Sequence, residues 1–177
     1  TVSGTGHTIK GAKGFNDFAV TGDKASITLT GDDAAATTLV IGNGTPADDD
    51  VANITLKELK ALGGTLSIYG GAKDNVTSTV AADSIVIGQA PAKATPATAV
   101  VELGKNAVLG SETTTTSFTI GNGGELKFSG AGAKAVSKNG IVLNGGAINS
   151  AADSTGTIAG GLTVKVGKLD VANKGTL

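Results

Sequence analysis

Short segments in which apolar and polar residues alternate, each closed by a glycine, recur along this 177-residue chain. Alternation with a period of two between Gly and Asn residues is typical of β-strands joined by tight turns, because successive side chains of a strand point to opposite faces. The turn sequence Ile-Gly-Asn-Gly occurs twice, at residues 41–44 and 120–123. The alternating segments are residues 39–42, 66–70, 85–88, 101–104, 118–121, 141–145 and 162–167. The sequence therefore predicts an all-β fold.

The interval between equivalent segments indicates how the strands are arranged. Ile120, Leu143 and Val166 follow one another at equal steps along the chain. The strands that follow each turn keep nearly the same step, as the positions of Leu126, Ile148 and Leu169 show. Two series that advance together are expected when coils of about 20 to 25 residues stack equivalent strands about 4.8 Å apart. The spacing therefore predicts a parallel β-helix, a form of β-solenoid.

The first half of the chain is less regular. The step from Ile41 to Ile68 is longer than those of the second half, whereas the steps from Ile87 to Leu103 and from Leu103 to Ile120 are shorter. Coils of variable length explain these differences. A β-sandwich is the alternative fold, because short strands with frequent turns also suit two packed antiparallel sheets.

Composition narrows the classes of protein to which the chain can belong. Hydrophobic residues make up 40% of the chain and aromatic residues only 3%, which suits thin aliphatic layers better than a bulky core. The chain has no Cys, and its 14 basic residues are all Lys, so disulfides, thiolate metal sites and bidentate Arg clamps are excluded. A formal net charge of -1 argues against a nucleic-acid partner. We expect no cofactor and, because the apolar runs are short, no membrane span.

The chain is expected to form one domain over residues 1–177. A length of 177 residues suits a single domain or a segment of a longer repetitive one. Because Thr1 is not a translation start, we interpret the chain as a processed product or as a segment of a longer repetitive protein.

Residues 51–64 interrupt the alternating pattern. Leu56, Leu59 and Leu62 recur at every third position, and Thr55 with Glu58 has the spacing of a capping box. This pattern favours a short helix that decorates the solenoid. A strand through residues 54–56 is the alternative.

Two segments resemble loops that protrude from the solenoid, and we predict that they contact a partner. Residues 90–98 carry two of the three prolines and no large apolar residue, and residues 46–50 contain a run of three aspartates. The predicted contact residues are Pro46, Asp48, Asp49, Asp50, Pro91, Lys93 and Pro96. Clustered carboxylates also suit Ca²⁺, but consecutive strand residues point in opposite directions, so a solvated loop is the preferred interpretation of the Asp run.

The sequence shows no clear grouping of residues suited to catalysis or to metal binding. His7 is the only imidazole and has no Cys or second His beside it, so a solvated position is expected and no metal site is predicted. A polysaccharide-active enzyme would need convergent carboxylates and aromatic platforms, whereas the acidic residues are scattered and Trp is absent. The threonines at residues 28–30 and 113–116 do not repeat at the coil interval, which an ice-binding face would require. We predict that the chain is not an enzyme.

With these repeats in view, residues 120–133 (Ile-Gly-Asn-Gly-Gly-Glu-Leu-Lys-Phe-Ser-Gly-Ala-Gly-Ala) resemble the passenger repeats of bacterial autotransporter adhesins. Residues 160–164 and 167–171 show the same order of glycine followed by alternating apolar and polar residues. The resemblance covers mainly residues 117–177. The resemblance implies a right-handed parallel β-helix displayed outside the cell, where it mediates attachment or cell-to-cell aggregation. The chain differs from the family in showing no secretion signal, so the resemblance does not extend to the export route.

The expected function is that of an extracellular, cell-surface adhesin or stalk segment. Outward Thr, Asn, Lys and Asp side chains would make many weak polar contacts along the rod. The expected partner is a glycan or protein on a host or neighbouring cell, or a second copy of the chain. A structural subunit of a phage fibre or extracellular filament is the alternative, and a polysaccharide-active β-helix enzyme is a more distant one.

Overall fold

Parallel pairing of strands dominates the computed structural model, which describes residues 7–9, 26–29, 38–42, 51–74, 76–89 and 98–172. Fourteen strands within these ranges join into one sheet, and the same ranges contain no helix. Every pairing between named strands is parallel. The all-β prediction is therefore confirmed, and the pairing is that of stacked parallel strands, whereas a β-sandwich is built from antiparallel sheets.

The strands follow one another with short connections in the second half of the chain. They are β1 (His7–Ile9), β2 (Ser26–Leu29), β3 (Thr38–Ile41), β4 (Asn53–Ala61), β5 (Gly64–Ile68), β6 (Ser78–Ile87), β7 (Ala99–Leu103), β8 (Ala107–Ser111), β9 (Ser117–Gly121), β10 (Gly124–Phe128), β11 (Ala133–Ser137), β12 (Ile141–Ser150), β13 (Gly156–Ala159) and β14 (Leu162–Val171).

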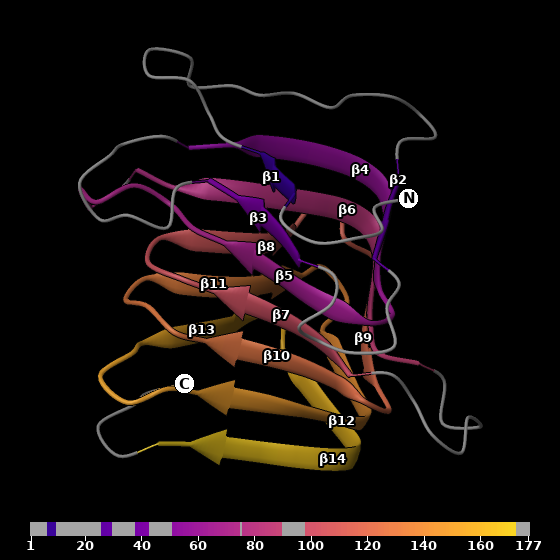
Figure 1. Cartoon of the computed structure of the whole chain (residues 1–177). Helices are drawn as coiled ribbons and strands as arrows, with labels where there is room; N and C mark the ends of the chain where they lie inside the picture. Colours follow the sequence, from indigo (N-terminus) through magenta and orange to yellow (C-terminus); the bar gives the residue numbers. More distant parts are fainter. Residues whose placement is uncertain are drawn as a thin grey trace.

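These strands stack in three ladders of parallel neighbours, and Figure 1 shows successive strands of ladder 1 one above another. Ladder 1 consists of β1, β3, β5, β7, β10 and the C-terminal halves of β12 and β14. Ladder 2 consists of β2, the C-terminal halves of β4 and β6, β9, and the N-terminal halves of β12 and β14. Ladder 3 consists of the N-terminal halves of β4 and β6, followed by β8, β11 and β13. Each long strand therefore continues from one ladder into the next.

The register in the second half of the chain agrees closely with the predicted intervals. Ile120 pairs with Leu143 in ladder 2. In ladder 1 the predicted series is found complete, since Leu126 pairs with Ile148 and Ile148 pairs with Leu169. One predicted partner is wrong: Leu143 pairs with Val164, whereas Val166 pairs with Asn144. The shift arises from an irregularity in the register between β12 and β14 that begins at Leu143/Asn144.

The irregular intervals of the first half have a simple structural origin. Ile41 does pair with Ile68, so the long step between them joins neighbouring strands of ladder 1. Leu103, however, pairs with Ile68 in ladder 1, while Ile87 pairs with Ile120 in ladder 2. The two short steps on either side of Leu103 therefore connect strands of different ladders, and Ile87 and Ile120 lie on neighbouring strands of ladder 2.

The helix predicted within residues 51–64 is wrong, and the alternative, a strand through residues 54–56, is confirmed as part of β4. Leu56 and Leu59 are both buried, although they lie three positions apart, because the two residues between them, Lys57 and Glu58, both lie on the outer side of the strand. At this point β4 leaves ladder 3 and enters ladder 2. The helix-like spacing of the leucines thus reflects a bend in a strand.

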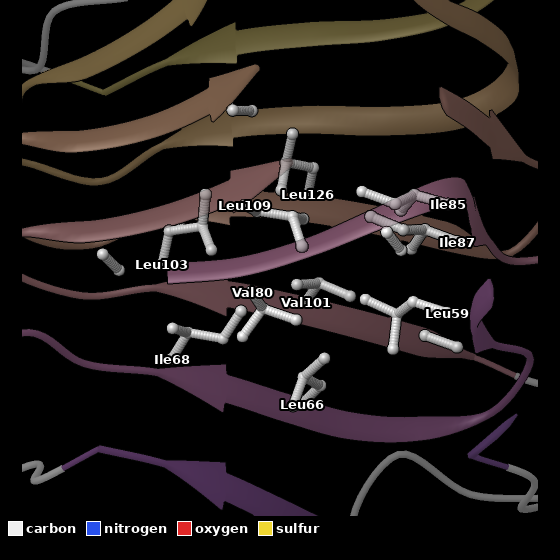
Figure 2. Close-up of a cluster of buried hydrophobic side chains, with 14 of the residues drawn as sticks. Leu59, Leu66, Ile68, Val80, Ile85, Ile87, Val101, Leu103, Leu109 and Leu126 are labelled. Carbon is white, nitrogen blue, oxygen red and sulfur yellow. The ribbon is translucent and has the colours of Figure 1, made fainter. Parts of the chain in front are cut away.

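The hydrophobic core lies where the inward faces of the three ladders meet. Figure 2 shows Leu66, Val101 and Leu126 of ladder 1 gathered with Ile85 of ladder 2 and Leu109 of ladder 3. All five side chains are fully buried. Each contributes roughly 1.5 to 3 kcal/mol through removal of apolar surface from water. Since the three ladder 1 residues are in register on consecutive strands, every level is stabilised mainly by the levels on either side.

Candidate interaction surfaces

The residues predicted to contact a partner lie outside the described residues. Pro46, Asp48, Asp49 and Asp50 fall between β3 and β4 in the sequence, and Pro91, Lys93 and Pro96 fall between β6 and β7. The alternative of Ca²⁺ binding at the Asp run falls there too. His7 belongs to β1, where its position in the backbone pairs with Leu39. These predictions therefore stay predictions, and the described surface is that of the three ladders and their turns.

The outward face of ladder 1 carries charged and amide side chains in register. Glu102, Lys127 and Asn149 occupy equivalent positions on β7, β10 and β12. Lys127 Nζ lies 3.2 Å from Glu102 Oε1, and Asn149 Nδ2 donates a hydrogen bond to Glu125 Oε1 at 2.8 Å. Asn149 Oδ1 is buried and accepts no hydrogen bond within the described part of the chain. Because partly exposed ion pairs contribute at most about 1 kcal/mol, a partner can reorganise this face at low energetic cost.

The outward face of ladder 2 mixes β-branched and charged residues. The residues in register on six successive strands are Thr28, Lys60, Val86, Thr119, Val142 and Thr163. Lysine and valine interrupt the threonines in this column, so the flat array of threonines needed to bind ice does not form here. Beside it, Lys60 Nζ lies 2.8 Å from Glu58 Oε1 on the same strand.

The bend between ladders 3 and 2 is a polar corner. Lys57 on β4 donates from Nζ to Asp83 Oδ2 on β6 at 2.6 Å, and both side chains are largely exposed. One strand further along the stack, Thr115 occupies the same corner with its side chain fully buried. Thr115 Oγ1 donates to the carbonyl of Ala82 at 2.7 Å and accepts from the amide of Ser111 at 2.9 Å. The corner is therefore a structural feature held by hydrogen bonds.

Sequence reasoning misses the burial of Thr115, because the run of four threonines at residues 113–116 is typical of a solvated strand. Of the four, Thr113, Thr114 and Thr116 are exposed, and the run forms the turn between β8 and β9. Sequence alone does not distinguish four identical residues. The one that turns inward is selected by the carbonyl of Ala82, which lies much earlier in the chain.

Asn106 fastens the turn that follows β5. Its backbone adopts φ = 53°, in the left-handed region that Asn tolerates better than most residues. Its Nδ2 donates to the carbonyls of Gly71 at 3.0 Å and Lys73 at 2.8 Å. Lys105 Nζ donates to the carbonyl of Ala72 and lies 3.5 Å from Asp74 Oδ1. This turn presents exposed charges from a fixed backbone, which makes it the best-built candidate contact site on the described surface.

Metal-binding clusters and membrane-spanning helices are both absent from the described ranges. Within these ranges, no group of three or more His, Asp or Glu side chains is placed to hold a metal ion. The same ranges hold no helix with the length and apolar character required to cross a bilayer. Among the described titratable groups, Lys168 has a perturbed pKa, which is raised by its hydrogen bond to Asp170 and by the charge of that carboxylate.

A comparison of the chain with known protein families, with curated proteins and with solved structures found no match. The resemblance of residues 117–177 to autotransporter passengers therefore stays a prediction, and the function has to be argued from the strand arrangement and the surface.

Proposed function

We propose that this chain is a segment of an extracellular bacterial adhesin or stalk, wound as a right-handed parallel β-helix. The observation that carries the proposal is the in-register stacking of ladder 1, in which strands from β1 to β14 follow one another in parallel. Such a stack is stiff, because each strand is hydrogen-bonded on both edges except at the ends of the ladder. A stiff rod with varied polar side chains suits the display of contact groups away from a cell surface.

The outward faces support binding spread over many weak contacts. The ion pair between Lys127 and Glu102 and that between Lys57 and Asp83 are exposed enough to exchange partners. Single contacts of this kind bind weakly, but several contacts made together by one rigid surface raise the overall affinity through effective concentration. The proposed partners are glycans or proteins on a host or neighbouring cell.

The turn fastened by Asn106 and the predicted contact segments are the proposed contact points. Residues 46–50 and 90–98 are retained as contact segments from the sequence. The turn at residues 70–74 adds exposed Lys73 and Asp74.

An attachment assay tests the proposal. The 177-residue chain would be coupled to beads, and the retention of the beads on cultured cells and their aggregation with one another would be measured. We expect uncoated beads to detach and coated beads to be retained. Replacing residues 91–96 with a Gly-Ser segment of equal length should lower retention several-fold, whereas Lys134→Ala, on the outward face of β11, should not. Coated beads that behave like uncoated beads on every cell type and glycan surface would contradict the proposal.

A subunit of an extracellular fibre is a second candidate, and one observation favours it. Strand β14, at one end of the stack, exposes Val164, Val166, Leu169 and Val171. A fibre subunit should form assemblies that lengthen as the concentration rises, and electron microscopy would show filaments. Assembly that stops at a small closed species would count against this candidate.

A further inference from the structure

The dipeptide Asn-Gly occurs four times in the chain, at residues 43–44, 122–123, 139–140 and 144–145. In this dipeptide the backbone nitrogen of Gly can attack the side-chain amide carbon of Asn, because Gly has no side chain to shield the nitrogen and its backbone rotates easily. The attack requires the peptide group between the two residues to turn toward the Asn side chain. Its rate in the folded chain therefore depends on how firmly the structure holds that peptide group.

Two of the three dipeptides in the described part of the chain are held firmly. The Asn122 carbonyl accepts a hydrogen bond from the Gln89 amide at 2.9 Å, and the Asn122 amide donates to the Gln89 carbonyl at 2.8 Å. Asn144 lies within β12, where it pairs with Gly121 of β9 on one side and with Val166 of β14 on the other. Attack at either position must first break hydrogen bonds between neighbouring segments of the stack.

Asn139 is held much less firmly. It lies in the turn between β11 and β12, and its side chain is exposed. Within the described residues, the peptide group between Asn139 and Gly140 makes one backbone hydrogen bond, from the Gly140 amide to the Ser137 carbonyl at 3.3 Å. That distance is at the long end for an amide and a carbonyl, so the bond is weak. The turn can therefore release this peptide group without opening a strand.

We propose that Asn139 is a site of spontaneous deamidation. The Gly140 nitrogen loses its proton to hydroxide and forms a bond to Asn139 Cγ. The bond from Cγ to Nδ2 breaks, and the departing nitrogen takes a proton from water and leaves as ammonia. A second water molecule opens the resulting succinimide at either of its carbonyls, which yields aspartate or isoaspartate. Nothing is oxidised or reduced, and each product has a carboxylate in place of the amide.

Deamidation removes a hydrogen bond between this turn and the turn that precedes β9. Asn139 Nδ2 donates to the Thr116 carbonyl at 2.9 Å, beside a bond from the Lys138 amide to the Thr115 carbonyl at 2.8 Å. A carboxylate at position 139 cannot donate and would place a second acceptor against the Thr116 carbonyl. Isoaspartate also lengthens the main chain by a carbon atom between Lys138 and β12. Both products therefore loosen the contact between the two turns.

Incubation of the 177-residue chain in mildly alkaline buffer, followed by proteolysis and tandem mass spectrometry, tests the proposal. The fragment masses locate the exchange of amide for acid at single residues. In the folded chain we expect Asn139 to convert at least roughly tenfold faster than Asn122 or Asn144. In urea that unfolds the chain, the three residues should convert at similar rates, because the protection by the stack is lost. This comparison separates the effect of the structure from that of the dipeptide.

Asn139→Gln is the matched variant, since it keeps the side-chain amide but would have to close a larger and less favourable ring. It should abolish the conversion at position 139 and leave Asn122 and Asn144 unchanged. Asn139→Asp carries the carboxylate of the product from the start. It should unfold at a lower urea concentration than Asn139→Gln, because it cannot donate to the Thr116 carbonyl.

The proposal is overturned if Asn122 or Asn144 converts as fast as Asn139 in the folded chain. It is also overturned if folded Asn139 stays intact over the time in which the unfolded chain converts. Equal stability of Asn139→Asp and Asn139→Gln would overturn the inferred loosening of the turn. The inference goes beyond the adhesive role and does not depend on it. Bead retention is not involved, so failure here is distinguishable from failure of the proposed function.

Discussion

Gly156 on β13 lies against the ring of Phe128, and its replacement by alanine measures how tightly the core is packed. A Cβ at position 156 would lie 2.5 Å from Phe128 Cγ and 2.7 Å from Cδ1, which is too close for any real contact. The ring of Phe128 is fully buried, so it cannot move into solvent. Gly156 does not have a positive φ, so alanine adds no backbone strain. Since overpacking of a core costs about 1 to 3 kcal/mol, we expect Gly156→Ala to lower the free energy of unfolding by about 2 kcal/mol.

A double-mutant cycle isolates the contact. Phe128→Leu alone should cost about 1 to 2 kcal/mol, because it removes buried carbon atoms and leaves a small cavity. The double variant Gly156→Ala/Phe128→Leu should be more stable than the sum of the two changes predicts, by about 1 to 2 kcal/mol, since the new methyl group enters the vacated space. The free energies would be measured by urea unfolding, with an unchanged dependence on urea as the test of a common unfolded state.

Leu66→Ala provides the control for this cycle, because Leu66 is equally buried but lies on β5, two strands from β10 in ladder 1. Combined with Gly156→Ala, it should give additive effects within about 0.5 kcal/mol. The reasoning is refuted if Gly156→Ala costs less than about 0.5 kcal/mol, or if Phe128→Leu and Leu66→Ala couple to it equally.

Three further predictions concern polar groups. Thr115→Val should cost about 2 kcal/mol in urea unfolding, since it leaves a buried carbonyl and a partly buried amide without their partner, whereas Thr114→Val on the exposed side of the turn should change stability by less than about 0.5 kcal/mol. Asn106→Ala should be less stable than Asn106→Gly by about 1 kcal/mol, because both lose two hydrogen bonds but only alanine opposes the positive φ; equal stability would contradict this. Asp170→Asn should lower the pKa of Lys168 toward its ordinary value in an NMR titration, since the raised pKa depends on the carboxylate; an unchanged titration would contradict that cause.

The sequence is sufficient to predict the register where turns are short. Alternation marks the inward residues, and the repeated turn sets the interval, so Leu126, Ile148 and Leu169 are aligned correctly. The error at Val166 arises because the register between β12 and β14 shifts where both strands bend. An extra residue at a bend leaves the alternation on either side unchanged, and so it cannot be detected from spacing.

The first half of the chain is harder to interpret because alternation does not reveal to which ladder a strand belongs. Ile87, Leu103 and Ile120 all sit in similar apolar segments, yet Leu103 lies in a different ladder from the other two. The bend in β4 gives a second error of the same kind. Two consecutive outward residues place Leu56 and Leu59 three positions apart, which is also the spacing of a helix face.

The surface can be predicted only in part. Clusters of Pro and Asp are chosen as contact residues because they depart from the repeat, and all of them lie outside the described residues. Asn106 and Thr115 hold the turns through hydrogen bonds to carbonyls of residues much earlier in the chain, Gly71 and Ala82. Contacts over such a sequence distance depend on the stacking, and no local pattern indicates which polar residue of a turn will be buried.

Core packing restricts which residues can occupy the inward positions of the ladders, but it does not restrict the outward positions. The residues that recognise a partner can therefore vary on the outward face. Along ladder 1, one inward column from β5 to β12 is aliphatic at every level, and each side chain in it is fully buried. The outward column beside it holds Thr65, Val100, Glu125, Ala147 and Lys168. Because partly exposed neighbours interact by less than about 1 kcal/mol, stability does not determine which residues occupy this column. Its side chains can therefore change specificity without unfolding the stack, and a partner gains selectivity only by contacting several levels together.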